Sequence, residues 1–202
     1  MTRFFTILIV FGFFGAAPGP GYVMASGLDD GLAAIQSGDY QAALQAFRPL
    51  AEQGDARAQY QIGQMHGRGH GTPKNYDLAA QWYRKAAEQG HAEAQFDLGS
   101  LYLRGVGVPR NNELAAKWWR RAADSGDAAA QSALGDMYLE GVGVEPDLVQ
   151  AYKWLMLAEP RTRNGRIPWG AIGLRDLAKR LTVKQRVLAE REVRKWIAAH
   201  KP

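Results

Sequence analysis

Two histidines of the chain have the spacing of a helical metal site. His66 and His70 lie four residues apart, which would place both imidazoles on one face of a helix. No glutamate joins them in the motif of a zinc protease. His91-Ala92-Glu93 has the His-x-Glu spacing of zinc deaminases, but the cysteine pair of those enzymes is missing because the chain has no cysteine. We therefore predict no metal site and no cofactor.

Other catalytic patterns are equally incomplete. Gly105-Val106-Gly107 and Gly141-Val142-Gly143 resemble nucleotide-binding loops, but they follow helical patterns rather than strands, and no Lys-Ser or Lys-Thr pair comes after them. The sequence has no Gly-x-Ser-x-Gly or Ser-x-x-Lys to supply a serine nucleophile. Without cysteine there is no catalytic thiol, disulfide or thiolate metal site. We predict that the chain is not an enzyme.

The elements that would position these residues repeat with a step of 36 residues. Ala58-Gln59-Tyr60-Gln61-Ile62-Gly63 recurs as Ala94-Gln95-Phe96-Asp97-Leu98-Gly99 and as Ala130-Gln131-Ser132-Ala133-Leu134-Gly135. Each copy reads as two helices, and a unit this short cannot bury its apolar face alone, so the copies must stack into a solenoid. We predict full repeats at 55–90, 91–126 and 127–158, preceded by a degenerate pair at 28–54.

The repeat assigns several candidate residues to the scaffold. His66 stands at the position of Tyr102 and Tyr138, which indicates a core aromatic position. Three tryptophans also recur at the repeat step and are predicted to lie in the core: Trp82, Trp118 and Trp154. Three glycines stand inside the first helices, where glycine costs about 1 kcal/mol relative to alanine: Gly63, Gly99 and Gly135. We predict that the second helix approaches closely there, with a Trp or Tyr over the missing side chain.

Residues 1–25 have the layout of a signal peptide. A short basic start precedes an apolar run from Phe4 to Ala17, and Val23-Met24-Ala25 offers small residues for cleavage. The run has 14 residues, fewer than the roughly 20 that span a bilayer as a helix. We therefore predict a periplasmic or secreted protein with a cleaved signal, and an uncleaved inner-membrane anchor remains the alternative. Export makes nucleic acid an unexpected partner.

The charge of the chain is concentrated at its C-terminal end. Residues 1–160 have 13 Lys and Arg against 17 Asp and Glu, whereas residues 161–202 have 12 against 3. The latter segment is predicted to be a basic loop followed by a capping helix pair, in which Thr182 and Gln185 form a capping box. The loop carries Arg161, Arg163, Arg166 and Trp169, and Trp169 lies outside the repeat pattern. This end could bind an anionic polysaccharide or membrane surface, or it could be a solvated cap that keeps the protein soluble.

The repeated pattern Ala-x-x-x-Leu-Gly-x-Met-Tyr-x-x-Gly-x-Gly-Val, followed by Ala-x-x-Trp-x-x-Lys-Ala-Ala-x-x-Gly, resembles the Sel-one-like repeat, a relative of the tetratricopeptide repeat. Residues 55–158 match it in three copies and 28–54 match weakly. The first full copy departs from it at Gly67–Pro73, where the Gly-Val-Gly-Val form is replaced. The resemblance implies an all-α, right-handed α-solenoid of antiparallel helix pairs whose first helices line the concave face. It also implies adaptors and regulators of protein complexes, with exported bacterial members in envelope signalling, exopolysaccharide export and host interaction. A cysteine-rich branch binds penicillin, and the absence of cysteine here argues against transferring that property.

One face of the first helices changes from copy to copy. The varying positions are spaced +4, +7 and +11, which places them on one side of each helix. We call this face the variable stripe: Arg57, Gln61, Gln64 and Arg68; then Glu93, Asp97, Ser100 and Arg104; then Ala129, Ala133, Asp136 and Glu140. Its polarity runs from mixed to acidic. We predict that it binds another protein, as a helix in a groove or as an extended peptide.

These patterns together predict a non-enzymatic scaffold or regulator of the periplasm or cell envelope. The partner would be a protein bound on the concave face of the repeats. The alternative is a protein associated with the cell wall or with exopolysaccharide through the basic end.

Overall fold

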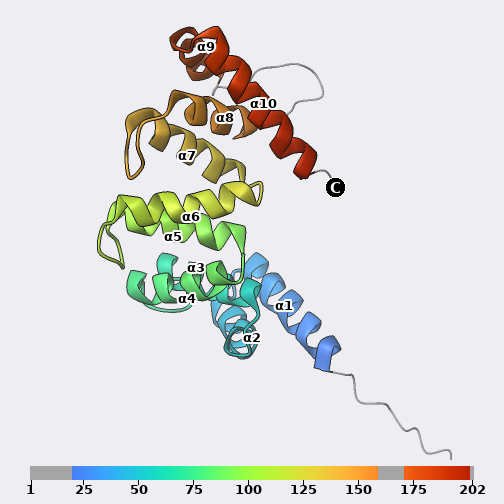
Figure 1. Cartoon of the computed structure of the whole chain (residues 1–202). Coiled ribbons are helices and arrows are strands. Elements are labelled where there is room, and N and C mark those ends of the chain that lie inside the picture. The colour runs from blue at the N-terminus through green and yellow to red at the C-terminus, as the bar shows by residue number, and fades with distance from the viewer. Residues whose placement is uncertain (1–19, 159–170, 201–202) are drawn as a thin grey trace, which may run out of the picture.

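A computed structural model describes residues 20–158 and 171–200, and these residues form ten α-helices and no strand. Helices α1 to α8 pack as antiparallel pairs that stack into an α-solenoid, and α9 and α10 each pack on α8 at the C-terminal end of the solenoid (Figure 1). The helices are α1 Pro20–Ser37, α2 Tyr40–Glu52, α3 Ala56–Arg68, α4 Tyr76–Glu88, α5 Ala92–Arg104, α6 Asn112–Asp124, α7 Ala128–Glu140, α8 Leu148–Ala158, α9 Ala171–Arg180 and α10 Val183–Ala199. The predicted all-α solenoid is confirmed.

The two ends of the chain differ from what the sequence predicts or lie beyond the described residues. Helix α1 begins at Pro20, whereas the sequence predicts the first helix from Leu28, so the helix overlaps the end of the predicted signal segment. Residues 1–19 and the loop with Arg161, Arg163, Arg166 and Trp169 lie outside the described residues. None of the described helices is long and apolar enough to cross a membrane.

Side-chain caps begin the helices at the repeat step. Asp55, His91 and Asp127 each accept a hydrogen bond from the backbone N–H three residues on, at 2.9, 3.4 and 2.7 Å, and so start α3, α5 and α7. His91 is thus the N-cap of α5. Asn75 and Asn111 cap α4 and α6 in the same way, at 3.0 and 2.9 Å.

The glycines inside the first helices are sites of close helix approach, as predicted. A Cβ added at Gly63 would lie 2.6 Å from Cδ1 of Tyr83, and one at Gly99 would lie 2.5 Å from Cδ1 of Trp119. The third copy differs, because an aliphatic side chain, Leu155, covers Gly135. The missing side chain therefore lets a large residue of the second helix lie across the first helix. This gain in packing outweighs the low helix propensity of glycine.

Buried glutamines join each repeat to the one before it. The Nε2 amides of Gln59, Gln95 and Gln131 donate to the backbone carbonyls of Ala51, Ala87 and Ala123 at 3.1, 3.0 and 3.1 Å. Those carbonyls lie in the last turns of the preceding second helices, where each also accepts a hydrogen bond at 3.1 Å from the backbone N–H of Gly54, Gly90 or Gly126. The glutamine of the repeated Ala-Gln pair is therefore a structural residue that adds a second hydrogen bond to a helix end in the neighbouring repeat.

The loops between paired helices also stack at the repeat step. Gly107 adopts φ 69°, and a Cβ there would collide with the backbone carbonyl of Tyr76 in the preceding repeat. Gly71 lies in the same way against the carbonyl of Tyr40, and its own carbonyl accepts a hydrogen bond from Nε2 of Gln41 at 2.7 Å. The first full repeat thus keeps the loop contact although its sequence departs from the Gly-Val-Gly-Val form.

The expected burial of the three recurring tryptophans is right for one of them. Trp154 is fully buried, because α10 packs on α8 and brings Trp196 against the same core. Trp82 and Trp118 are only partly buried, and the next residues, Tyr83 and Trp119, point into the core instead. The 36-residue step therefore identifies equivalent positions but does not ensure equal burial, which depends on what covers each second helix.

Candidate functional site

The variable stripe lies on the accessible side of α3, α5 and α7. Six of its predicted binding residues are exposed: Arg57, Arg68, Glu93, Arg104, Asp136 and Glu140. The other four are partly buried: Gln61, Gln64, Asp97 and Ser100. Their local contacts are mostly within one helix, such as the bond from Oγ of Ser100 to the carbonyl of Phe96 at 3.0 Å. Most polar groups of the stripe therefore do not hold different helices together.

Asp97 is the residue of the stripe with the richest surroundings. It lies on α5 and interacts with the hydroxyl groups of Tyr60 on α3 and Tyr83 on α4. The Arg68 guanidinium at the end of α3 adds a favourable charge. We call Asp97, Tyr60, Tyr83 and Arg68 the tyrosine–aspartate cluster. It draws side chains from three helices of two repeats onto one face.

The cluster holds Asp97 in an environment that disfavours its charge. Burial raises the pKa of Asp97 above its usual range, while the Tyr60 hydroxyl and Arg68 oppose that rise. Burial also raises the pKa of Tyr60 and of Tyr83, and the Asp97 carboxylate raises both further, so both phenols stay protonated at neutral pH. A partly buried carboxylate with a raised pKa is a candidate for a functional role.

The packing around Tyr60 is specific to this part of the chain. Its ring lies 5.7 Å from the ring of Tyr83 and 4.6 Å from that of His91, and its hydroxyl accepts a hydrogen bond from Nε2 of Gln64 at 2.7 Å. Tyr83 reaches the cluster because Gly63 lets it cross α3. The corresponding residues of the next interface are Phe96 and Trp119, which have no hydroxyl. The cluster therefore does not recur.

Sequence reasoning places Asp97 on the stripe but misses the two tyrosines beside it. Tyr83 stands at the position of Trp119 and Leu155 in the second helices, and Tyr60 lies one residue before the stripe position Gln61. The sequence does contain an indication of Tyr60, because this position changes to Phe96 and then to Ser132 in the next two copies. Polar atoms at the tip of a core aromatic residue can thus reach a surface that its backbone position does not indicate.

The far end of the stripe is acidic. Burial raises the pKa of Asp136, and the neighbouring Glu140 raises it further, since two negative charges one helical turn apart repel each other. In the same helix, the position equivalent to Asp97 is Ala133. The third repeat therefore presents paired carboxylates without tyrosine hydroxyl groups around them.

The two histidines at i and i+4 have separate environments. His66 is buried in α3, as its position in the repeat predicts, whereas His70 lies in the following loop and stacks on Tyr40 with ring centroids 4.1 Å apart. Among residues 20–158 and 171–200, no three His, Cys, Asp or Glu side chains gather as metal ligands would.

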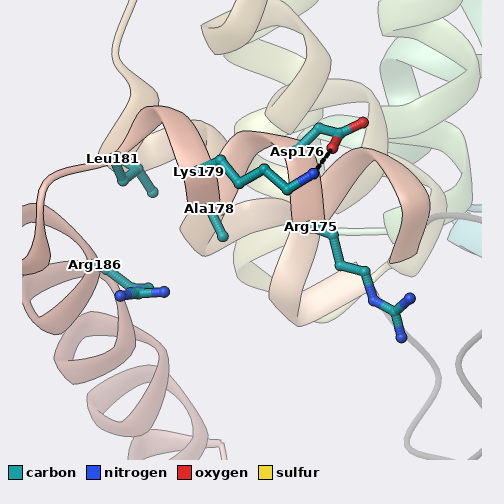
Figure 2. Close-up of a pocket in the computed structure, with 6 residues that line it drawn as sticks. All are labelled: Arg175, Asp176, Ala178, Lys179, Leu181 and Arg186. Atoms are coloured by element: carbon teal, nitrogen blue, oxygen red, sulfur yellow. Dashed lines mark hydrogen bonds and ion pairs between the residues drawn. The ribbon is translucent and has the colours of Figure 1, made fainter.

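The C-terminal pair forms a second candidate surface, which we call the basic turn. A hollow of about 530 Å³ lies between α9 and α10 (Figure 2). It is lined by Arg175, Asp176, Ala178, Lys179, Leu181 and Arg186. Lys179 is neutralised by Asp176 at 2.8 Å. In contrast, Arg175, Arg180, Lys184 and Arg186 form no ion pair within the described part of the chain.

Exposed aliphatic side chains accompany those cations. Val183, Val187 and Leu188 on the first turns of α10 are 69, 55 and 40 % exposed. The capping box predicted at this point is present, since the Thr182 and Gln185 side chains bond to each other's backbone N–H. A terminal repeat needs a polar outer face for solubility, so three exposed aliphatic residues within it require another explanation.

Comparison with known proteins gives a consistent result. A model of the Sel1 repeat matches residues 56–91, 92–127 and 128–158. The chain is similar to the crystal structure of a Sel1 repeat protein from Oxalobacter formigenes, with 37% identity and a TM-score of 0.62 over 63% of this chain and 53% of that one. It is also similar to c5321, a protective antigen present in uropathogenic Escherichia coli strains displaying an SLR fold, with 38% identity and a TM-score of 0.68 over 78% of this chain and 33% of that one.

The chain thus spans about half and a third of the lengths of these two structures. No protein of curated function matches it. Three consecutive repeat matches, together with the helix pairs, the crossed glycines and the stacked loops, lead to one assignment: the chain belongs to the Sel1 repeat family.

Proposed function

We propose that the chain is a non-enzymatic scaffold or regulator that binds a protein segment along the variable stripe. Sel1 repeats generally mediate protein–protein interaction, and repeats of this kind are typically non-catalytic. A solenoid suits this role because stacking gives each repeat a separate contact with one long ligand. The bound segment would lie across α3, α5 and α7.

The observation that carries the proposal is Asp97 in the tyrosine–aspartate cluster. Because burial disfavours the charge of Asp97, a neutral residue at this position would make the folded chain more stable, and the next copy has such a residue, Ala133. A cationic side chain of a partner would remove the cost by pairing with the carboxylate in a partly dehydrated site. The acidic pair at Asp136 and Glu140 continues this preference, so the partner segment should carry Lys or Arg spaced along one side.

Site-specific photocrosslinking tests this proposal. A photoreactive amino acid at Ser100, in the centre of the stripe, should give a discrete crosslinked product in envelope extracts, and one at the exposed Lys117 of α6 should not. Asp136→Lys with Glu140→Lys should weaken capture at least ten-fold. The control is Glu113→Lys on α6, which reverses one exposed carboxylate away from the stripe. Equal labelling from Ser100 and Lys117 would refute binding at the stripe.

A second candidate function follows from the basic turn. Unpaired cations beside exposed Val183, Val187 and Leu188 suit an anionic phospholipid surface better than a polysaccharide, because aliphatic side chains gain from the bilayer interface and little from hydroxyl-rich sugars. We propose it as an accessory contact that holds the scaffold at the envelope. It agrees with the expected periplasmic or secreted location, which mass spectrometry of the mature N-terminus would check by finding a start near Ser26.

Vesicle cosedimentation distinguishes these surfaces. Phosphatidylglycerol vesicles should retain the protein and phosphatidylcholine vesicles should not, and retention should fall at high salt. Lys184→Glu and Leu188→Ser should each reduce it, whereas Lys117→Glu on α6 should not. Retention on alginate beads that survives Leu188→Ser would instead favour the polysaccharide.

A further inference from the structure

A cavity of about 230 Å³ lies between α2, α3 and α4, away from the variable stripe. Arg48 and Glu52 of α2 and Leu78 and Trp82 of α4 form its walls, and Ile62 and His66 of α3 form its floor. The cavity therefore opens between two consecutive second helices. It is polar at Arg48, Glu52 and His66 and apolar elsewhere, which is the composition of a small-molecule site.

The same positions in the next repeat show what this interface normally holds. There the residue equivalent to His66 is Tyr102, and its hydroxyl accepts a hydrogen bond from Nη2 of Arg84 at 2.6 Å. Arg84 stands 36 residues after Arg48, and Trp118 stands 36 after Trp82. In the third repeat Arg120 lies 5.2 Å from the ring centroid of Tyr138 and 5.3 Å from that of Trp154. Arginine and tryptophan recur in all three interfaces, and the phenol is replaced in the first.

His66, which lines this cavity, has a buried ring nitrogen without a partner in the described part of the chain. The residue is 8 % exposed, and its Nδ1 atom has no hydrogen-bond partner among the described residues. Burial lowers the pKa of His66, and the Arg48 charge lowers it further, so the ring is neutral at pH 7. A neutral imidazole can accept a hydrogen bond at Nδ1 when its proton is on Nε2. A buried polar atom without a partner is unusual in a folded protein, and a ligand that meets it through a turn of the imidazole ring would satisfy it.

We propose that this cavity binds a phenolic ring. The ring would pack on Ile62, Leu78 and Trp82, and its hydroxyl would donate to Nδ1 of His66 and accept from Arg48. The volume is sufficient, since a cavity of about 150 Å³ accommodates benzene. The phenol could be a free small molecule or the side chain of a tyrosine in a bound peptide. This site is separate from the stripe and does not depend on the function proposed for it.

NMR of the tryptophan indole N–H groups tests the proposal on the full chain. Titration with 4-methylphenol should shift the Trp82 indole signal and saturate with a Kd of roughly 1 mM. Toluene lacks the hydroxyl and should bind at least ten-fold more weakly. A Gly-Tyr-Gly peptide and 4-methylphenol distinguish the two sources: comparable binding of both indicates a peptide tyrosine, and binding of 4-methylphenol alone indicates a small molecule.

The repeats supply matched variants. His66→Tyr restores the residue of the other copies and should abolish the Trp82 response, as should Leu78→Phe, which fills the cavity from α4. Tyr102→His should create a second response at Trp118. Circular dichroism would confirm that each variant is folded. An undiminished Trp82 response in folded His66→Tyr and Leu78→Phe, or equal affinity for toluene, would overturn the proposal.

Discussion

The buried and exposed sides of α3, α5 and α7 follow opposite rules. On the buried side the same contacts occur three times: a glutamine bonds to the preceding repeat, and a glycine is crossed by a side chain of the second helix. On the exposed side the tyrosine–aspartate cluster occurs at one interface, and Ala133 stands at the position of Asp97 in the next. Residues that recur in every copy therefore join the repeats, whereas residues that change between copies are particular to this chain.

On the buried side, the largest effect is expected from adding a side chain at one of the helical glycines. Gly99→Ala would place a Cβ 2.5 Å from Cδ1 of Trp119 and 3.2 Å from the backbone oxygen of Ala115. We expect the free energy of unfolding to fall by about 1–3 kcal/mol, despite the better helix propensity of alanine. Urea denaturation followed by circular dichroism measures this. Ser100→Ala, the adjacent and partly exposed position, should be nearly neutral, and equal stability of both variants would contradict the close approach.

A smaller effect is expected at the glutamines. Gln95→Met keeps the side-chain volume but removes one of the hydrogen bonds to the Ala87 carbonyl, which still accepts from the N–H of Gly90, so it should cost about 0.5–1.5 kcal/mol of unfolding free energy. Gln59→Met should cost more than Gln95→Met, because Oε1 of Gln59 also accepts from Gln89 at 2.8 Å. The same denaturation series checks this order. A neutral effect at both positions would show that the inter-repeat bond contributes nothing.

On the exposed side, Asp97→Asn should stabilise the protein in a pH-dependent way. The folded-state pKa of Asp97 is raised, so the folded chain binds a proton more tightly than the unfolded chain does. Stability from that proton is complete below the unfolded pKa of about 3.9 and is lost as pH rises through the folded pKa. The variant does not titrate there, so its advantage should grow with pH and reach a plateau. Thermal melts from pH 3 to 7 measure it, and an advantage that grows towards acid would be inconsistent with a buried carboxylate.

The smallest effect concerns a position where the two sides meet. His91 caps α5, whereas Asp55 and Asp127 cap α3 and α7. His91→Asp should raise the free energy of unfolding by roughly 0.5 kcal/mol, because aspartate is a better N-cap and favours the positive helix end. It should also remove the imidazole ring that packs against Tyr60 and weaken crosslinking from Ser100. A gain in stability with unchanged crosslinking would separate His91 from the binding face.

Much of the scaffold could be predicted from the sequence because the residues of each contact occur in three copies. The close approach of the second helix at the three helical glycines was predicted because a residue of low helix propensity recurs at one position. The first pair, α1 and α2, has the same kind of glycine contact, but the 36-residue step does not reveal it. Gly31 of α1 packs against Phe47, but Phe47 stands 36 residues before Tyr83 while Gly31 stands 32 before Gly63, since the loop between α1 and α2 is shorter. A fixed step cannot find a contact once the loop length changes.

The candidate site could be predicted only in part. Variation between copies identified Asp97, because a surface position is free to differ. It could not identify Tyr83, whose backbone belongs to the scaffold and whose hydroxyl belongs to the cluster. Nor could it foresee the aliphatic side chains exposed on α10, because their neighbours lie in a helix pair without a copy to compare. Side-chain reach and the cover provided by non-repeated elements are properties of the assembled chain.

The loop glycines have a consequence for the growth of such arrays. Gly71 and Gly107 each lie against the first residue of the second helix one repeat earlier, and Gly143 does the same with Asn112. This loop contact is therefore the same at each of these junctions, and a tandem duplication of 36 residues would reproduce it on both sides of the inserted module. Gene duplication would lengthen this surface by one repeat at a time. Each added repeat would bring a new set of exposed side chains, which selection can change while the loop contact stays the same.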